Sequence, residues 1–226
     1  MDERLEDLSH ALDHRFDRIA LLRQAVTHPS ADGERGRASA FERLEFLGDR
    51  VLGLVVAEML LERYPDEAEG DLARRQAALV NRDQVARVAL ALGIDRVLVL
   101  SKGEQEAGGH ANPAMLADAC EAVLGALFQD GGFQAAARIV RARWQPLMEE
   151  SAAPPRDAKT ALQEWAQARG RPLPSYAVLS REGPAHGPKF HVTVSVTGEA
   201  QAEGRGASKR AAEQAAAAAL LERVTR

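Results

Sequence analysis

The sequence predicts a two-domain α + α/β protein, in which an all-α domain precedes a small α-β-β-β-α domain. Apolar residues recur at helical spacing through the first 148 residues, and no convincing strand alternation occurs there. Residues 151–157 contain two prolines and no large apolar side chain, which is typical of a linker. Behind them, apolar residues alternate from Phe190 to Val196, which predicts a strand. The expected parts are a domain over 1–150, a linker over 151–157 and a domain over 158–226.

The beginning of the all-α domain is expected to contain two short helices and one long one. Residues 5–12 and 19–26 keep the apolar spacing of helices, and a polar loop is expected over 28–39. Residues 40–64 are rich in apolar side chains and predict a long helix, which Pro65 ends.

The second part of this domain is also expected to be helical. Residues 69–92 resemble two helices, with Asn81 or Asp83 as the N-cap of the second and Gly93 at its end. The remaining expected elements are a loop over 101–112, a helix from Pro113 to Gly131–Gly132, and a helix over 133–148.

The back domain is expected to contain a helix, three strands and a second helix. The expected helices cover 158–169 and 208–223, and the expected strands cover 176–181, 189–196 and about 199–204.

Composition excludes several protein classes. With 46% hydrophobic and 27% charged residues, the chain can bury a core and is not a disordered tail. The single cysteine, Cys120, excludes a disulfide framework and a cysteine-rich zinc module, and it suits a reducing compartment. The acidic start lacks the layout of a signal peptide, and the most apolar stretch, 51–61, is shorter than a bilayer span. We therefore expect a cytoplasmic protein with no membrane partner.

Charge is divided unevenly along the chain. The net charge is −4, yet residues 156–226 carry 11 Lys and Arg against 7 Asp and Glu, a net of +4. The preceding residues carry 18 against 26, a net of −8. The acidic part is suited to cations and the basic part to phosphates.

Carboxylates form a pattern on two apolar helices. Glu42, Glu45 and Asp49 stand at i, i+3 and i+7, and Asp118 and Glu121 repeat the i, i+3 spacing. Two acidic groups within apolar helices favour an all-oxygen site for a hard cation such as Mg²⁺, which serves phosphoryl chemistry. Acids at this spacing are also common on solvated helix faces, so the spacing alone leaves both interpretations open.

The run from Glu42 to Asp49, Glu-Arg-Leu-Glu-Phe-Leu-Gly-Asp, resembles the signature of ribonuclease III, the double-stranded-RNA endonuclease. Thr27-His28 precedes this run, Glu69-Gly-Asp follows it, and residues 116–122 resemble the family's second acidic motif. The resemblance extends over about residues 5–224.

The resemblance implies an Mg²⁺-dependent endoribonuclease, with Mn²⁺ as a substitute metal. The implied metal ligands, of which Asp49 and Glu121 are the catalytic pair, are Glu45, Asp49, Asp118 and Glu121. Glu42 and Glu69 are implied to support the site or to contact RNA. The implied products carry 5′-phosphate and 3′-hydroxyl ends with short 3′ overhangs, in rRNA precursor processing and mRNA turnover. Arg50 departs from the small residue that many members carry, and its role is open.

The back domain resembles a double-stranded-RNA-binding domain in three regions. These are the helix around 159–167, the turn at 183–186 and the start of the last helix, where main-chain N–H groups also favour phosphate. Three such contacts read A-form RNA by its shape. The expected RNA-binding residues are Thr160, Gln163, Gln167, His186, Ser208, Lys209 and Arg210.

The signature helix also predicts a homodimer. It carries more apolar residues than one face of a helix needs for its own core, namely Phe41, Phe46, Leu47, Leu52, Val55 and Val56. Two-fold pairing would set two acidic sites along one duplex, one for each strand. The resemblance implies the same, with Phe46 as an inserting aromatic residue. The alternative is that all six side chains fill the monomer core.

Other functions and residues have plainer interpretations. A double-stranded-RNA-binding regulator that no longer cuts would not need the acidic set, and a phosphohydrolase for small nucleotides would not need the basic domain. His10 and His14 are expected to be surface histidines, because no third metal ligand is evident. Cys120, Trp144 and Trp165 are expected to be core residues.

Overall fold

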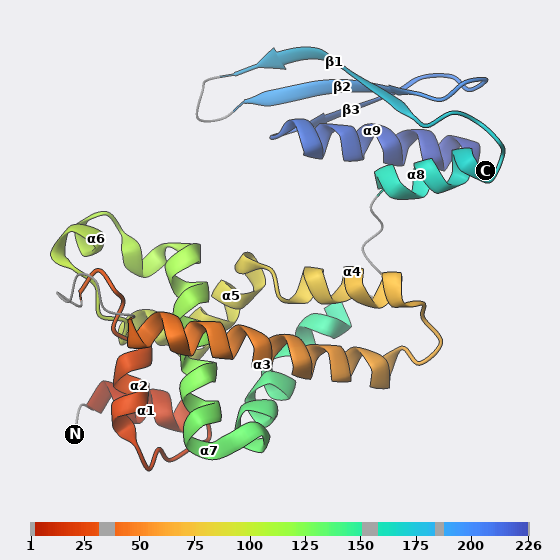
Figure 1. The fold of residues 1–226 in the computed structure, drawn as a ribbon. Helices are drawn as coiled ribbons and strands as arrows, with labels where there is room; N and C mark the ends of the chain where they lie inside the picture. The colour runs from red at the N-terminus through yellow and green to blue at the C-terminus, as the bar shows by residue number, and fades with distance from the viewer. Residues whose placement is uncertain (1–2, 32–38, 151–157, 184–187, 226) are drawn as a thin grey trace. The chain divides into compact units, whose positions relative to one another are not determined.

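The computed structural model describes residues 3–31, 39–150, 158–183 and 188–225 (Figure 1). The chain divides into two compact units, Met1–Pro155 and Arg156–Arg226. In the described residues the first unit is helical and the second combines three strands with two helices, which confirms the predicted fold class. None of the helices in this part of the chain combines the length and apolar character that a bilayer crossing requires.

Helices build the described part of the first unit. They are α1 (Glu3–Ala11), α2 (Ile19–Ala25), α3 (Ala40–Arg63), α4 (Glu69–Leu79), α5 (Arg82–Leu92), α6 (Lys102–Glu106) and α7 (Pro113–Glu150), with short 3₁₀ turns η1 (Ile94–Arg96) and η2 (Gly109–Ala111). The predicted loop over 101–112 is therefore wrong, because α6 and η2 lie within it. The side chain of Ser101 begins α6 by accepting a hydrogen bond from the Glu104 N–H at 3.3 Å.

Local signals place two of the helix ends where the sequence predicts them. Asn81 caps α5, since its side-chain oxygen accepts from the Gln84 N–H at 3.0 Å, and Gly93 ends that helix with a φ of 76°. At Gly132 the backbone leaves the helical region, with φ 73° and ψ −175°, so α7 consists of two helical segments that meet at a kink. This confirms the predicted break at the glycine pair.

The core of the first unit includes the contact between α3 and α7, which cross each other (Figure 1). Trp144 on α7 is completely buried, as predicted, and its indole N–H donates to the Leu79 carbonyl at 3.0 Å. Cys120 is also completely buried. The core thus holds the two helices that carry the acidic residues against each other.

The apolar excess on α3 is smaller than predicted. Four of the six residues assigned to it are at most 2% exposed, namely Phe41, Leu52, Val55 and Val56. For these four residues the alternative interpretation as monomer core is correct, because α3 is covered on more than one side by its own unit. Phe46 remains 65% exposed, together with Leu54 and Leu61, and Leu47 is partly buried.

The second unit is a three-stranded antiparallel sheet with both helices on one face (Figure 1). Its elements are α8 (Ala158–Gln167), β1 (Ser175–Glu182), β2 (Lys189–Ser195), β3 (Ala202–Gly206) and α9 (Lys209–Val224), and the strand order is β1-β2-β3. The third strand begins three residues later than predicted, because a turn at Gly198, with φ 85°, precedes it. Trp165 is partly buried and packs against this unit's core.

Close packing joins the sheet to α9. A Cβ at Gly204 would stand 2.1 Å from the Ala216 backbone nitrogen, so β3 and α9 are in backbone contact. The alanine-rich sequence of α9 permits this approach, since Ala212, Ala216 and Ala217 are completely buried.

Candidate metal centre and RNA-binding surface

Three carboxylates converge where α3 meets α7. Glu45 of α3 and Asp118 and Glu121 of α7 offer oxygen atoms that all lie within 4.8 Å of one another. Each of the three residues is partly buried. An all-oxygen set of this size and charge fits a hard divalent cation such as Mg²⁺.

Two glycines bring these carboxylates together. A Cβ at Gly48 of α3 would stand 1.7 Å from the Glu121 carbonyl oxygen. A Cβ at Gly125 of α7 would stand 2.1 Å from the Leu44 carbonyl oxygen. The backbones of the two helices therefore touch beside the acidic residues. Sequence analysis missed both glycines, although a glycine inside an apolar helix is a recognisable signal of close packing.

The acidic group is electrostatically unfavourable without a cation. Burial raises the pKa of Glu121 to about 7, and the charges of Asp118 and Glu45 add to this effect. Burial is also the main cause that raises the pKa of Glu45 and that of Asp118. The sites resist ionisation because water is partly excluded and like charges are close, and a bound divalent cation would relieve both effects.

Cationic groups lie near the same site. For Asp118, the charges of Arg82 and His28 oppose the larger effect of burial on the pKa. The ring of His28 packs edge-on against Phe41, with ring centroids 5.6 Å apart. His28 therefore contacts α3 and lies near Asp118 of α7.

The fourth predicted ligand has a different partner. Among the described residues, the group of converging carboxylates does not include Asp49, whose side chain is 44% exposed and forms an ion pair with Arg50. Glu42 is exposed, and its charge contributes to the raised pKa of Glu45. Glu69 is exposed at the first position of α4.

A groove in the second unit collects four of the predicted RNA-binding residues. Its volume is about 620 Å³, and Thr160 and Gln163 of α8 line it together with Lys209 and Arg210 of α9. All four side chains belong to exposed residues, and Lys209 lies 3.8 Å from the Glu213 carboxylate. The groove thus combines hydrogen-bonding groups with cations, which suits the backbone of a nucleic acid.

Two other predicted RNA-binding residues, Ser208 and Gln167, do not line this groove. Ser208 caps α9, since its hydroxyl accepts from the Ala211 N–H at 3.1 Å. Gln167 is exposed at the last position of α8. His186 lies outside the described residues.

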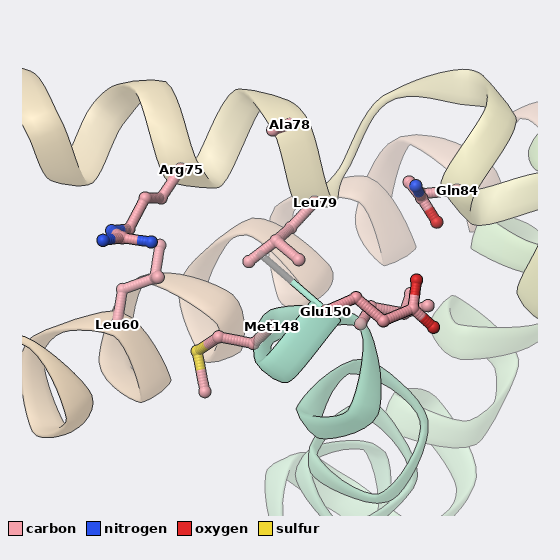
Figure 2. A pocket seen from close by; sticks show the side chains of 8 residues that line it. Leu60, Arg75, Ala78, Leu79, Gln84, Met148 and Glu150 are labelled. Atoms are coloured by element: carbon pink, nitrogen blue, oxygen red, sulfur yellow. The ribbon is translucent and has the colours of Figure 1, made fainter. Parts of the chain in front are cut away.

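Figure 2 shows a pocket of about 260 Å³ elsewhere in the first unit. It is lined by Leu60, Arg75, Ala78, Leu79, Gln84, Leu147, Met148 and Glu150. Arg75 is only 4% exposed, and two 2.7 Å hydrogen bonds join its guanidinium to Glu67. The guanidinium also lies 3.7 Å from the centroid of the Tyr64 ring. These contacts assign Arg75 a structural role, because its charge is fully engaged by its own unit.

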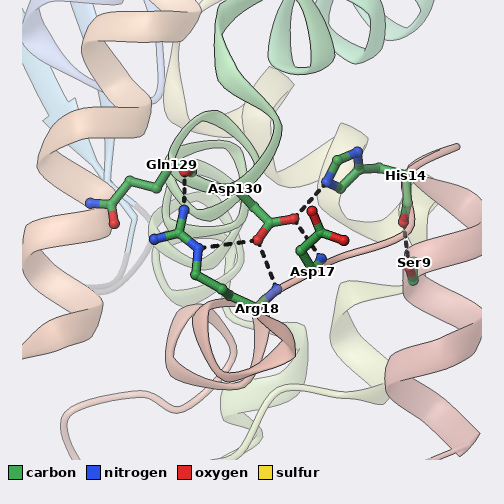
Figure 3. A network of polar contacts seen from close by, with 6 residues as sticks. All are labelled: Ser9, His14, Asp17, Arg18, Gln129 and Asp130. Atoms are coloured by element: carbon green, nitrogen blue, oxygen red, sulfur yellow. Dashed lines mark hydrogen bonds and ion pairs between the residues drawn. The ribbon is translucent and has the colours of Figure 1, made fainter.

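The prediction that His14 is a surface histidine is wrong, because its ring is paired with Asp130 (Figure 3). Its ring pairs with Asp130 at 2.9 Å, and Asp130 also accepts from the backbone N–H groups of Asp17 and Arg18, at 3.0 and 2.9 Å. Burial acts to raise the pKa of Asp130, but these hydrogen bonds lower it overall. Asp130 thereby secures the start of α2 to α7.

Comparisons with known proteins identify the family of each unit. Residues 18–147 match the family described as Ribonuclease-III-like, and residues 158–224 match the double-stranded RNA binding motif. The chain is 48% identical over 219 residues to "Ribonuclease 3" of Methylocella silvestris, covering 97% of this chain and 92% of the relative. It is 47% identical over 227 residues to "Ribonuclease 3" of Caulobacter vibrioides, covering 99% and 98%.

Two solved structures of a ribonuclease III nuclease domain are also similar to the helical unit. A nuclease domain of ribonuclease III from Campylobacter jejuni, solved at 2.2 Å resolution, is 39% identical with a TM-score of 0.56, and the match covers 64% of this chain and 93% of that one. A second structure of that nuclease domain, described as flexible in a region involved in dimer formation, is 37% identical with a TM-score of 0.57, covering 62% and 99%.

Proposed function

Because this chain belongs to the ribonuclease III family of double-stranded-RNA endonucleases, we propose that it hydrolyses RNA duplexes with Mg²⁺ held by Glu45, Asp118 and Glu121. The observation that carries this proposal is the convergence of the three carboxylates within 4.8 Å on two helices whose backbones touch. The proposed products have 5′-phosphate and 3′-hydroxyl ends with short 3′ overhangs. Mn²⁺ is expected to substitute for Mg²⁺.

The carboxylates have distinct tasks in this proposal. A divalent cation, when bound, polarises the scissile phosphate and increases the acidity of a water molecule. Glu45 of α3 and Asp118 of α7 would hold the cation between the two helices. Burial raises the pKa of the Glu121 carboxyl to about 7, so this group holds a proton in part of the population near neutral pH and would have to lose it to act as a ligand. Asp49, which pairs with Arg50 in this structure, would be the fourth ligand.

The second unit supplies affinity for the duplex. The groove lined by Thr160, Gln163, Lys209 and Arg210 offers the hydroxyl and amide groups that suit 2′-hydroxyls and the cations that suit phosphates. Such recognition reads shape and not base sequence, so a broad range of duplexes is expected to bind. Proposed cellular substrates are rRNA precursors and structured mRNA in the cytoplasm.

We also propose that the protein acts as a homodimer through α3. Phe46, Leu54 and Leu61 are 65%, 59% and 60% exposed, and helix geometry places them within a sector of about 80°. Exposed apolar groups on one side of a helix favour a self-complementary contact. The nuclease domain from Campylobacter jejuni is described as having a region involved in dimer formation. Two copies would present one acidic group to each strand of a duplex.

The test compares a long RNA duplex with one of its strands alone, each with and without Mg²⁺. We expect cleavage of the duplex only when metal is present. Binding without cleavage under all metal conditions would instead support a double-stranded-RNA-binding regulator. Sedimentation of the full chain without RNA tests the dimer, and a monomer at micromolar concentration would contradict it.

A further inference from the structure

Arg50 lies at the edge of the acidic group and makes two defined contacts on α3. Its guanidinium forms an ion pair with the Asp49 carboxylate and lies 5.0 Å from the centroid of the Phe46 ring. The side chains of Arg50 and Asp49 are 64% and 44% exposed. The pair is therefore accessible to ions from solvent, and the guanidinium also contacts the Phe46 ring.

Helix geometry places Phe46 on the same side of α3 as Arg50. Adjacent residues of a helix point about 100° apart, so Arg50 and Asp49 do not face each other by default. Phe46 stands four residues before Arg50, on the same side of α3, and its exposed ring offers a surface for the guanidinium. The stacked arginine can then turn its charge toward Asp49.

The charge of Arg50 also reaches the converging carboxylates. Burial, Asp118 and Glu45 raise the pKa of Glu121 to about 7, and the charge of Arg50 acts in the opposite direction. Arg50 therefore supplies positive charge to the same acidic group that a divalent cation would occupy. Asp49, in turn, is engaged with Arg50 and does not belong to the converging group among the described residues.

We propose that Arg50 is a positioning residue that withholds the Asp49 carboxylate from the metal site until a divalent cation displaces its guanidinium. The inference rests on the proposed metal site. Removing Arg50 frees Asp49 to join Glu45, Asp118 and Glu121, and it also removes a positive charge that opposes the cation. Both effects strengthen metal binding.

The expected change is about fivefold tighter binding of a divalent cation after Arg50→Ala. This factor corresponds to about 1 kcal/mol, at 1.4 kcal/mol for each factor of ten. It lies at the upper end of what an exposed ion pair contributes. Alanine is a strong helix former, so α3 is expected to remain intact in the variant.

The experiment measures Mn²⁺ binding to the full chain without RNA, from the electron paramagnetic resonance signal of free Mn²⁺. Arg63→Ala is the matched control, because Arg63 is an exposed arginine on the same helix, with its guanidinium 5.3 Å from the Tyr64 ring centroid. It lies 13 residues from Arg50, about 20 Å along the helix. We expect tighter Mn²⁺ binding for Arg50→Ala and wild-type binding for Arg63→Ala. In an Asp49→Asn background, Arg50→Ala is expected to lose most of its effect.

Several results would overturn the inference. Arg50→Ala binding that equals or is weaker than wild type would show that the guanidinium does not compete with the cation. An equal gain in Mn²⁺ affinity for Arg63→Ala would show that the effect comes only from the change in net charge. An undiminished gain in Mn²⁺ affinity for Arg50→Ala in the Asp49→Asn background would exclude a role through Asp49. Wild-type and Glu121→Gln proteins that bind Mn²⁺ equally would refute the proposed metal site itself, and the inference with it.

Discussion

Adding a methyl group at Gly48 should separate α3 from α7 and disable the acidic group. In Gly48→Ala the new Cβ would stand 1.7 Å from the Glu121 carbonyl oxygen and 2.6 Å from the Glu121 carbonyl carbon, whereas ordinary contacts begin at 3.4 Å. The helices must therefore move apart by about 1.7 Å, the difference between these two distances. Because Glu45 is one turn from Gly48 on α3, it moves away from Glu121 by a similar amount.

Two magnitudes follow for this variant. Overpacking costs about 1–3 kcal/mol, and the helix propensity of alanine returns about 1 kcal/mol, so the net loss in the free energy of unfolding is up to about 2 kcal/mol. A misplacement of about 1 Å at a reacting centre costs about 100-fold in rate. We therefore expect cleavage of an RNA duplex to fall about 100-fold or more, while most of the protein remains folded at 25 °C.

The control for this variant is Gly53→Ala on the same helix. The nearest atom to a Cβ at Gly53 is the side-chain nitrogen of Gln76 at 3.5 Å, which is an ordinary contact. That variant should retain wild-type cleavage and gain up to about 1 kcal/mol in stability. Initial cleavage rates and urea unfolding are measured for both variants. Near wild-type cleavage and unchanged stability in Gly48→Ala would refute the contact between the helices.

Three further predictions concern the same two sites. Glu121→Gln should abolish duplex cleavage in Mg²⁺ yet leave duplex affinity nearly unchanged in a gel-shift assay, because an amide is a poor ligand for a hard cation. The pKa of Glu121 is raised from 4.5 to about 7, so the folded protein binds this proton more tightly than the unfolded chain does. The resulting stabilisation is fully present below about pH 4.5 and is lost as the pH rises through 7. Urea unfolding in chelator at pH 5 and pH 8 should therefore show a smaller pH dependence for Glu121→Gln than for wild type, and equal slopes would contradict the burial of this carboxylate. Replacing Lys209 and Arg210 by alanine should weaken binding alike for unrelated duplexes and reduce the salt slope by roughly 0.7–0.9 log units for each lost contact, on a scale derived from DNA. An unchanged slope would place the phosphate contacts elsewhere.

Local features of the fold were predictable because they depend on nearby residues. The cap at Asn81, the end at Gly93 and the break at Gly132 follow from the intrinsic conformations of those residues. The short helix α6 was not predicted, because its glycine-rich surroundings resemble a loop and it is only five residues long.

Contacts between distant residues were harder to predict. The acidic spacing on each helix was visible, but the meeting of Glu45 with Asp118 depends on the crossing of α3 and α7. The spacing of the acidic residues does not by itself distinguish a metal site from solvated helix faces. Likewise, nothing near His14 in the sequence indicates that Asp130, 116 residues away, is its partner.

In helix α3 the spacing of apolar residues does not predict which of them are buried. It is apolar on several sides, so the pattern could not separate buried Phe41 from exposed Phe46. The packing of the unit decides this, and it leaves a smaller exposed patch than the sequence suggested. The proposed dimer contact accordingly depends on Phe46, Leu54 and Leu61.

Each unit of the protein contains one tryptophan, so tryptophan fluorescence can report on the folding of each unit. Trp144 is sealed in the core of the first unit, whereas Trp165 is partly buried in the second, with the guanidinium of Arg169 4.5 Å from its ring centroid. An indole in an apolar interior emits at shorter wavelength than one near water and charge. Substituting either tryptophan by phenylalanine would thus leave a chain whose tryptophan emission, excited where tyrosine does not absorb, follows one unit alone. The melting of each unit could then be recorded within the intact protein.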